Sequence, residues 1–262
     1  MYSNQNPGLS SIRPSCLAQA QPTIEANRLA LPSSAKYVNF VHQLAPPFIE
    51  LFTEIFREEG LWSAFASGPS SVRGHHSKVD GNLLHCLEVA EICICLGELY
   101  DDVVDQDVLL SAALLHDIGK ADEYENQLFG FRMSPVGKMI GHKMSGFAVV
   151  YSALRQVKGL TDAQIIGLKN CIACTSGFSH DIRGPGCFEA EILIKADQLS
   201  AAGDLYRKSY AARGGKAGFG LHHPHQRQTP FHIGGSLPPT PPTTPKSKSR
   251  FGYTSLKPRG AM

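Results

Sequence analysis

Apolar side chains recur at helical spacing through the middle of the chain. From residue 83 to residue 99 they return every third or fourth position, and residues 108–115 are apolar on nearly every side. We expect helices over residues 36–44, 48–56, 83–99, 108–115, 140–157, 163–174 and 189–202. No segment alternates convincingly between apolar and polar residues, and only residues 129–133 suggest a short hairpin arm. The pattern therefore predicts an all-α fold built as a helical bundle.

The two ends of the chain differ in composition from this middle part. Residues 1–35 are rich in Ser, Pro, Asn and Gln, which predicts a flexible arm. Beyond about residue 212, repeated glycines and a Pro/Thr-rich run favour neither helix nor strand. We therefore predict a flexible arm over residues 1–35, a helical domain over residues 36–206 and a basic, Pro/Gly/Thr-rich disordered tail over residues 207–262.

Charge is divided unevenly along the chain. The whole sequence carries a net charge of +2, but residues 1–206 hold 15 Lys/Arg against 23 Asp/Glu, a net of −8, and the remainder carries +10. A tail of this kind could attract nucleic acid by releasing counterions from it, or it could be only a solvated extension. The sequence leaves both interpretations open.

Composition also bears on location. No stretch approaches 18 uninterrupted apolar residues, so a membrane span is not expected. The polar residues 1–14 lack the basic-then-apolar pattern of a secretory signal. Seven cysteines, an odd number, argue for a reducing compartment rather than a disulfide framework. We therefore expect a cytoplasmic protein.

The motif Leu114–Lys120 (LLHDIGK) is the sharpest local signal for chemistry. A buried helix ends in His116 beside Asp117, and Gly119 follows at a position typical of a helix C-cap. Polar groups at such a place are costly unless something satisfies them, and a metal ion bound by an imidazole and a carboxylate would do so. The alternative for this doublet alone is an ordinary helix end with a capping histidine and a surface aspartate.

Two further residues extend the motif. His85 lies near the start of an apolar helix, and Asp197 follows Leu193 by one helical turn. Taken singly, His85 would be a core histidine whose hydrogen bonds are satisfied by the protein. Asp197 would be a solvent-exposed aspartate at the edge of an apolar helix face. Together with His116 and Asp117 they form a set of two imidazoles and two carboxylates, which suits Mn, Fe, Ni, Zn or, less well, Mg.

This order of motifs resembles the HD-domain superfamily of metal-dependent phosphohydrolases, whose members are all-helical. The resemblance rests on four stretches, residues 81–90 (GNLLHCLEVA), 114–120, 137–142 (GKMIGH) and 189–193 (EAEIL), and covers residues 36–206. Within the superfamily the chain is similar to two subgroups, the HD domain of YhaM-type 3′→5′ exoribonucleases and the N-terminal HD-like domain of conjugative relaxases. In the relaxase subgroup a His-rich lead, here His75-His76, precedes the first motif.

The resemblance implies roles for six residues. His85, His116, Asp117 and Asp197 match the metal ligands of the family, and Lys120 matches a residue that faces a substrate phosphate. His142 matches a position that serves a second metal or the substrate in some members. The alternative for Lys120 is a solvated cation at a helix end, whose charge interacts favourably with the helix dipole. The alternative for His142 is a polar residue in a turn flanked by glycine.

The chain also departs from the exonuclease pattern. That pattern carries further histidines after position 160, whereas Asn170, Thr175 and Ser176 stand here, and amide and hydroxyl groups hold transition metals poorly. The departure favours one ion over two. In addition, no strand-rich region supplies the OB-type nucleic-acid-binding domain of the exonucleases.

We therefore expect a phosphohydrolase that acts on a phosphoester of a nucleotide or nucleic acid. The cation would lower the pKa of a bound water, Asp117 would orient that water, Lys120 would neutralise phosphate charge, and His142 would position the substrate or protonate the leaving oxygen. The alternative is a catalytically weak, metal-stabilised module of a conjugation or mobile-element system that binds nucleic acid or a partner protein. The sequence does not choose the metal, the substrate or the oligomeric state.

Overall fold

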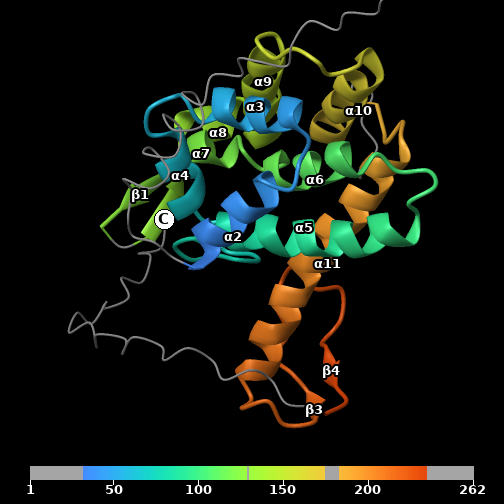
Figure 1. The fold of residues 1–262 in the computed structure, drawn as a ribbon. Helices are drawn as coiled ribbons and strands as arrows, with labels where there is room; N and C mark the ends of the chain where they lie inside the picture. Colours follow the sequence, from blue (N-terminus) through green and yellow to red (C-terminus); the bar gives the residue numbers. More distant parts are fainter. Residues whose placement is uncertain (1–31, 129, 175–182, 235–262) are drawn as a thin grey trace, which may run out of the picture. The chain divides into compact units, whose positions relative to one another are not determined.

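The computed structural model describes residues 32–128, 130–174 and 183–234 (Figure 1). Residues 1–31 of the predicted arm, residues 235–262 of the predicted tail, and Thr175 and Ser176 lie outside these ranges. Contacts divide the chain into two compact units, with the boundary after Tyr206. The two units are described separately below.

The first unit is a bundle of helices, as the apolar pattern predicts, so the all-α expectation is confirmed. Its helices are α2 (Pro32–Val41), α3 (Pro46–Ile55), α4 (Leu61–Ser67), α5 (Gly81–Leu99), α6 (Gln106–Leu115), α7 (Lys120–Glu123), α8 (Pro135–Met139), α9 (His142–Leu154), α10 (Asp162–Ala173) and the main part of α11 (Phe188–Ala211). Helices α5 and α6 pack against each other in the middle of this unit (Figure 1). Every residue of α6 from Val108 to Leu115 is buried, as expected from its apolar surface.

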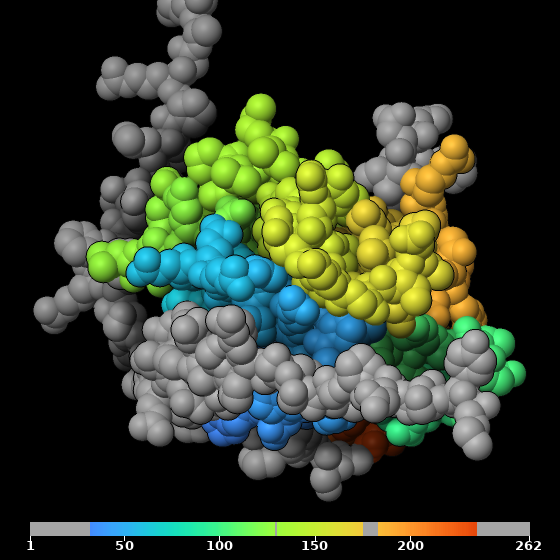
Figure 2. Space-filling view, turned by 45° about the horizontal axis from the view of Figure 1, so that its top comes forward, coloured from blue at the N-terminus to red at the C-terminus, as the bar shows by residue number. Residues whose placement is uncertain are grey.

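Side chains from several helices close the core around α6. Tyr37, which is 1% exposed, makes edge-to-face contacts with the aromatic rings of Phe52, Trp62 and Phe65. Its hydroxyl donates to the carbonyl of Leu114 at 3.1 Å, which satisfies the polar group of this buried tyrosine. This contact also fixes the end of α6, the point at which the His-Asp doublet begins. On one face of the unit, α9 and α10 lie beside α3 (Figure 2).

Three local features differ from the expected pattern or refine it. The helix expected over residues 140–157 is shorter and begins only at His142, because Gly141 before it has a φ of +77°, and the short helix α8 that precedes it was not expected. The short helix α4 was not expected, since it spans only 7 residues inside a Gly- and Ser-rich region. The expected hairpin is present: β1 (Tyr124–Gln127) pairs antiparallel with β2 (Gly130–Met133).

The second unit contains structure where the sequence predicts none. Helix α11 runs to Ala211, and β3 (Gly218–Phe219) pairs antiparallel with β4 (Phe231–His232). Side chains of the last helical turns support this short ladder: the Ser209 hydroxyl donates to the carbonyl of Leu221, and the ring of Tyr210 stacks on His232 at 4.4 Å. The expectation of neither helix nor strand is therefore wrong for this stretch, because these contacts stabilise a pairing that composition alone does not favour. Disorder of the remaining tail stays a prediction.

Among the residues that the structure describes, no helix combines the length and the apolar character that crossing a membrane requires.

Candidate metal centre

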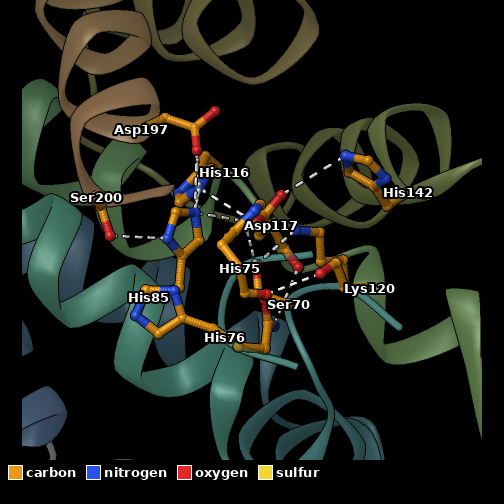
Figure 3. A network of polar contacts seen from close by, with 12 residues as sticks. Ser70, His75, His76, His85, His116, Asp117, Lys120, His142, Asp197 and Ser200 are labelled. Atoms are coloured by element: carbon orange, nitrogen blue, oxygen red, sulfur yellow. Dashed lines mark hydrogen bonds and ion pairs between the residues drawn. The ribbon is translucent and has the colours of Figure 1, made fainter. Parts of the chain in front are cut away.

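Three helices of the first unit bring the candidate metal ligands of the sequence to one place. His85 lies in the second turn of α5, His116 and Asp117 follow the end of α6, and Asp197 lies in the middle of α11 (Figure 3). His85 and His116 are 0% and 1% exposed, whereas the Asp197 side chain is 40% exposed and borders the solvent. The cluster is therefore buried on the imidazole side and open on the carboxylate side.

One ligand atom from each of three residues converges on a common point. Donor atoms of His85, His116 and Asp197 all lie within 4.8 Å of one another. The Nε2 atoms of the two imidazoles are 3.4 Å apart, and Asp197 Oδ1 is 3.0 Å from the Nε2 of His85 and 4.0 Å from that of His116. These distances suit atoms that surround one small cation.

The hydrogen bonds behind the two rings fix where their protons lie. Ser200 Oγ donates to the carboxylate of Glu88 at 2.9 Å, so at 3.0 Å it accepts from Nδ1 of His85. Nδ1 of His116 donates to the carbonyl of Ala113 at 2.8 Å. Both neutral rings therefore turn an unprotonated Nε2 towards the cluster, where each meets other lone pairs. Acceptors that face acceptors repel one another, and a cation between them would remove that repulsion, so the donor set fits a divalent metal.

Asp117 lies against the same point but is also engaged in an ion pair. Its Oδ2 is 3.3 Å from Nε2 of His116, 3.6 Å from Nε2 of His85 and 2.6 Å from Nζ of Lys120. Burial alone would raise the pKa of Asp117, but the Lys120 charge and then His116 outweigh it and hold this pKa well below its usual range. Asp117 is therefore a carboxylate at neutral pH and is placed to complete the set of four.

Asp197 is ionised as well. Burial raises its pKa, yet the adjoining ring of His85 and the proximity of His116 lower it to about 2. The site therefore offers two negative charges beside two imidazoles, a combination whose charge a divalent cation would balance.

Lys120 and His142 lie on the other side of Asp117. Lys120 is 7% exposed, and besides Asp117 it donates to Ser70 Oγ at 3.0 Å. His142, at the start of α9, has its Nε2 3.7 Å from Asp117 Oδ1 and its Nδ1 3.0 Å from a carboxylate oxygen of Glu123. All six residues singled out from the sequence thus lie in one region, while their roles stay predictions.

The sequence did not reveal several neighbours of the site. Ser70 and His75 belong to the loop before α5, Ser200 lies one turn beyond Asp197, and Glu123 ends α7. The only sequence signal among them was the His-rich lead at residues 75–76. The others are ordinary polar residues, and only the fold places them beside the imidazoles.

Gly119 has a different role from the C-cap that its position favours. Its φ of −69° is ordinary right-handed backbone, so no left-handed conformation requires a glycine here. Instead, a Cβ atom at this position would lie 2.1 Å from the carbonyl oxygen of His142 and 2.4 Å from the nitrogen of Gly146. The glycine permits the close approach of α9 to the motif.

Asn170, one of the positions that replace the expected histidines, is used structurally. Its Oδ1 accepts from the backbone N–H of Gly186 at 2.8 Å, and its Nδ2 donates to the carbonyl of Gly184 at 3.3 Å. The side chain therefore anchors the segment that leads into α11.

We predict that lowering the pH from 7 to 5 destabilises the metal-free protein. Burial lowers the pKa of His85, although the Asp197 carboxylate beside it acts in the opposite direction, and burial lowers the pKa of His75 to about 3. Both rings therefore bind a proton at lower pH in the folded protein than in the unfolded chain, where they bind protons below about pH 6.5. The free energy of unfolding should then fall by up to about 1.4 kcal/mol per pH unit for each ring.

Urea unfolding at pH 7, 6 and 5 in the presence of a chelator measures this effect. Because these two folded-state pKa values are lowered, their contribution is complete above pH 6.5 and declines on acidification. A free energy of unfolding that does not change between pH 7 and pH 5 would contradict neutral, buried imidazoles.

Comparison with known families agrees with this geometry. The family model described as HD domain matches residues 82–202, a range that includes all the residues of the cluster. The resemblance to the HD superfamily drawn from the sequence is therefore confirmed. No solved structure matched the chain.

Among curated proteins the chain is similar to 3′-5′ exoribonucleases named YhaM. It is 27% identical to that of Bacillus pumilus over 139 residues, which are 52% of this chain and 43% of the relative. It is 26% identical to the one from Listeria welshimeri over 146 residues (55% and 46%), and 24% identical to the one from Bacillus subtilis over 164 residues (62% and 51%). The chain thus spans about half the length of the curated relatives it matches.

Proposed function

We propose, from the HD domain that residues 82–202 carry, that this protein is a metal-dependent phosphohydrolase acting on a phosphoester of a nucleotide or nucleic acid. The observation that carries the proposal is the convergence of His85, His116 and Asp197, with donor atoms within 4.8 Å of one another. The similarity to proteins named 3′-5′ exoribonuclease supports a nucleic-acid phosphodiester as the substrate.

His85, His116, Asp117 and Asp197 would hold the cation. When bound, a divalent ion of this kind polarises a phosphoryl oxygen and lowers the pKa of water. The chain's own contribution is to fix the tautomers of His85 and His116 through Ser200 and the carbonyl of Ala113. Because these partners orient both rings before a ligand arrives, the donor set is preorganised.

The remaining polar groups would act on the substrate. His142 donates from Nδ1 to Glu123, which leaves its Nε2 available on the side of Asp117, where it could hold a proton for the leaving oxygen. Lys120 keeps Asp117 ionised and compensates part of the negative charge of the site. One ion is proposed rather than two, since the described residues form one such cluster and Asn170 is engaged with backbone groups.

Turnover assays with the purified full chain test this proposal. We expect hydrolysis of nucleotides or short oligonucleotides with at least one of Mn²⁺, Ni²⁺, Co²⁺ or Mg²⁺, and none in the presence of a chelator. The substrate panel should contain nucleoside monophosphates, cyclic nucleotides and single-stranded RNA and DNA. Salt-sensitive binding of oligonucleotide without turnover under any of these metals would contradict the proposal and favour a catalytically weak binding module.

A further inference from the structure

The loop between α4 and α5, residues 68–80, is held in one conformation. The N–H of Ser70 donates to the carbonyl of His76 at 3.2 Å, and the N–H of His76 donates to Asp204 Oδ2 on α11 at 2.8 Å. His76 and Asp80 have φ values of +44° and +62°, a left-handed backbone that non-glycine residues adopt at a cost. Such a conformation persists only where surrounding contacts determine it, so the loop has a specific shape.

That shape brings the ring of His75 to the edge of the metal centre. The ring centroids of His75 and His85 are 4.9 Å apart, and Nε2 of His75 is 2.9 Å from Ser70 Oγ (Figure 3). Ser70 is 1% exposed, whereas His75 is only partly buried. A ligand at the cluster can therefore reach His75, while the serine behind it stays enclosed.

The hydrogen-bond chain fixes the tautomer of His75. Lys120 Nζ can only donate, so Ser70 Oγ accepts from it at 3.0 Å. A hydroxyl oxygen has two lone pairs and could also accept from a protonated Nε2, but the hydroxyl hydrogen of Ser70, which is 1% exposed, would then lack an acceptor among the described residues. That hydrogen is therefore directed to Nε2 of His75, which accepts it. A neutral imidazole that accepts at Nε2 carries its own proton on Nδ1.

The Nδ1–H of His75 is therefore a hydrogen-bond donor that is in place before a ligand binds. It forms no hydrogen bond among residues 32–128, 130–174 and 183–234, since the only side-chain hydrogen bond of His75 there involves Nε2. Lys120, the residue that the family resemblance assigns to the substrate phosphate, already donates to both Asp117 and Ser70. A donor without an acceptor beside a cation site is suited to an anionic oxygen, because hydrogen bonds to charged groups are the strong ones.

We propose that His75 is a substrate-contacting residue whose Nδ1–H donates to a non-bridging oxygen of the bound phosphate group. Ser70 and Lys120 are its positioning residues: they do not reach the phosphate but hold the imidazole in the donating tautomer. This inference rests on the proposed phosphohydrolase function, and it assigns the phosphate contact to the loop rather than to Lys120.

Two substitutions of His75 distinguish the contribution of Nδ1 from that of Nε2. In His75→Asn the side-chain amide NH₂ can occupy the place of Nδ1–H, whereas in His75→Gln it can reach only the place of Nε2. The probe is inorganic phosphate, titrated calorimetrically into the full-length protein loaded with Mn²⁺. We expect His75→Gln to weaken phosphate binding at least about 10-fold, as for one lost hydrogen bond to a charged group, and His75→Asn to stay within about 3-fold of wild type.

A matched control and a metal measurement complete the experiment. His42→Asn changes an exposed histidine outside the site and should leave phosphate binding unchanged. Manganese content, measured by mass spectrometry after dialysis, should be the same in both His75 variants as in wild type. Ser70→Ala frees the tautomer and should weaken phosphate binding with unchanged manganese content.

Four results would overturn the proposal. They are wild-type phosphate affinity in His75→Gln, equal losses in His75→Asn and His75→Gln, loss of manganese from the His75 variants, and absence of phosphate binding by the wild-type protein. Because the titration needs no turnover, it is independent of the assay of the proposed function. If the wild-type protein binds phosphate in a His75-dependent manner but hydrolyses nothing, only the proposed function fails.

Discussion

A protein with His116→Ala and Asp117→Ala should bind Mn²⁺ at least about 100-fold more weakly than wild type and lose its phosphohydrolase activity. Groups that only orient metal ligands typically contribute 10–100-fold to metal affinity, so removal of two direct ligands should cost at least the upper end of that range. Equilibrium dialysis followed by elemental mass spectrometry gives the affinity, and the oligonucleotide assay gives the activity.

The double substitution also removes the partner of a buried cation. Without Asp117, Lys120 keeps only Ser70 as a side-chain partner in the part of the chain that the structure describes, and an uncompensated buried charge costs about 3–5 kcal/mol. A second variant, His116→Ala with Asp117→Asn, retains an oxygen acceptor for Lys120 and should fold while still losing the metal. Asp122→Ala, which removes an exposed carboxylate nearby, serves as the control. Wild-type manganese content in both double variants would show that the cluster is not a metal centre.

The sequence predicted those parts of the fold that local patterns determine. The helix over residues 108–115 is apolar all round, and the structure buries every side chain of it. Helix α4 was missed because 7 residues in a Gly- and Ser-rich stretch give too short a pattern, although Trp62 and Phe65 place it in the core. The ladder of β3 and β4 was missed because contacts with Ser209 and Tyr210, rather than strand propensity, stabilise it.

In the site, too, local sequence patterns reveal some residues, whereas others are defined only by contacts between distant parts of the chain. His116 and Asp117 stand out because a polar doublet at the end of a buried helix is unusual. His85 and Asp197 were added from their positions on apolar helices, and the family resemblance matched all four to metal ligands. Nothing local marks Ser70 or Ser200, since their importance comes from partners 50 and 115 residues away along the chain. Sequence patterns therefore identified the charged centre, whereas the groups that fix its tautomers required the three-dimensional arrangement.

Gly119→Ala should lower the free energy of unfolding by about 2–3 kcal/mol, a typical cost of overpacking. The added Cβ would lie 2.1 Å and 2.4 Å from backbone atoms of His142 and Gly146, and backbone atoms cannot swing aside as a side chain can. The fold can relieve this overlap only if α7 and α9 separate. Because the same movement would increase the distance of His142 from Asp117, now 3.7 Å, activity should fall further than metal binding does.

Gly167→Ala is the matched control, because it makes the same chemical change inside α10. There a Cβ would find only Val108 Cγ1 at 3.7 Å, an ordinary van der Waals contact. This substitution should stabilise the protein by about 0.5–1 kcal/mol, since alanine loses less conformational entropy in a helix than glycine does. Urea unfolding of both variants at pH 7 measures the difference. Equal stability of the two would mean that α9 does not approach the motif as closely as the structure indicates, and that Gly119 acts at a helix end after all.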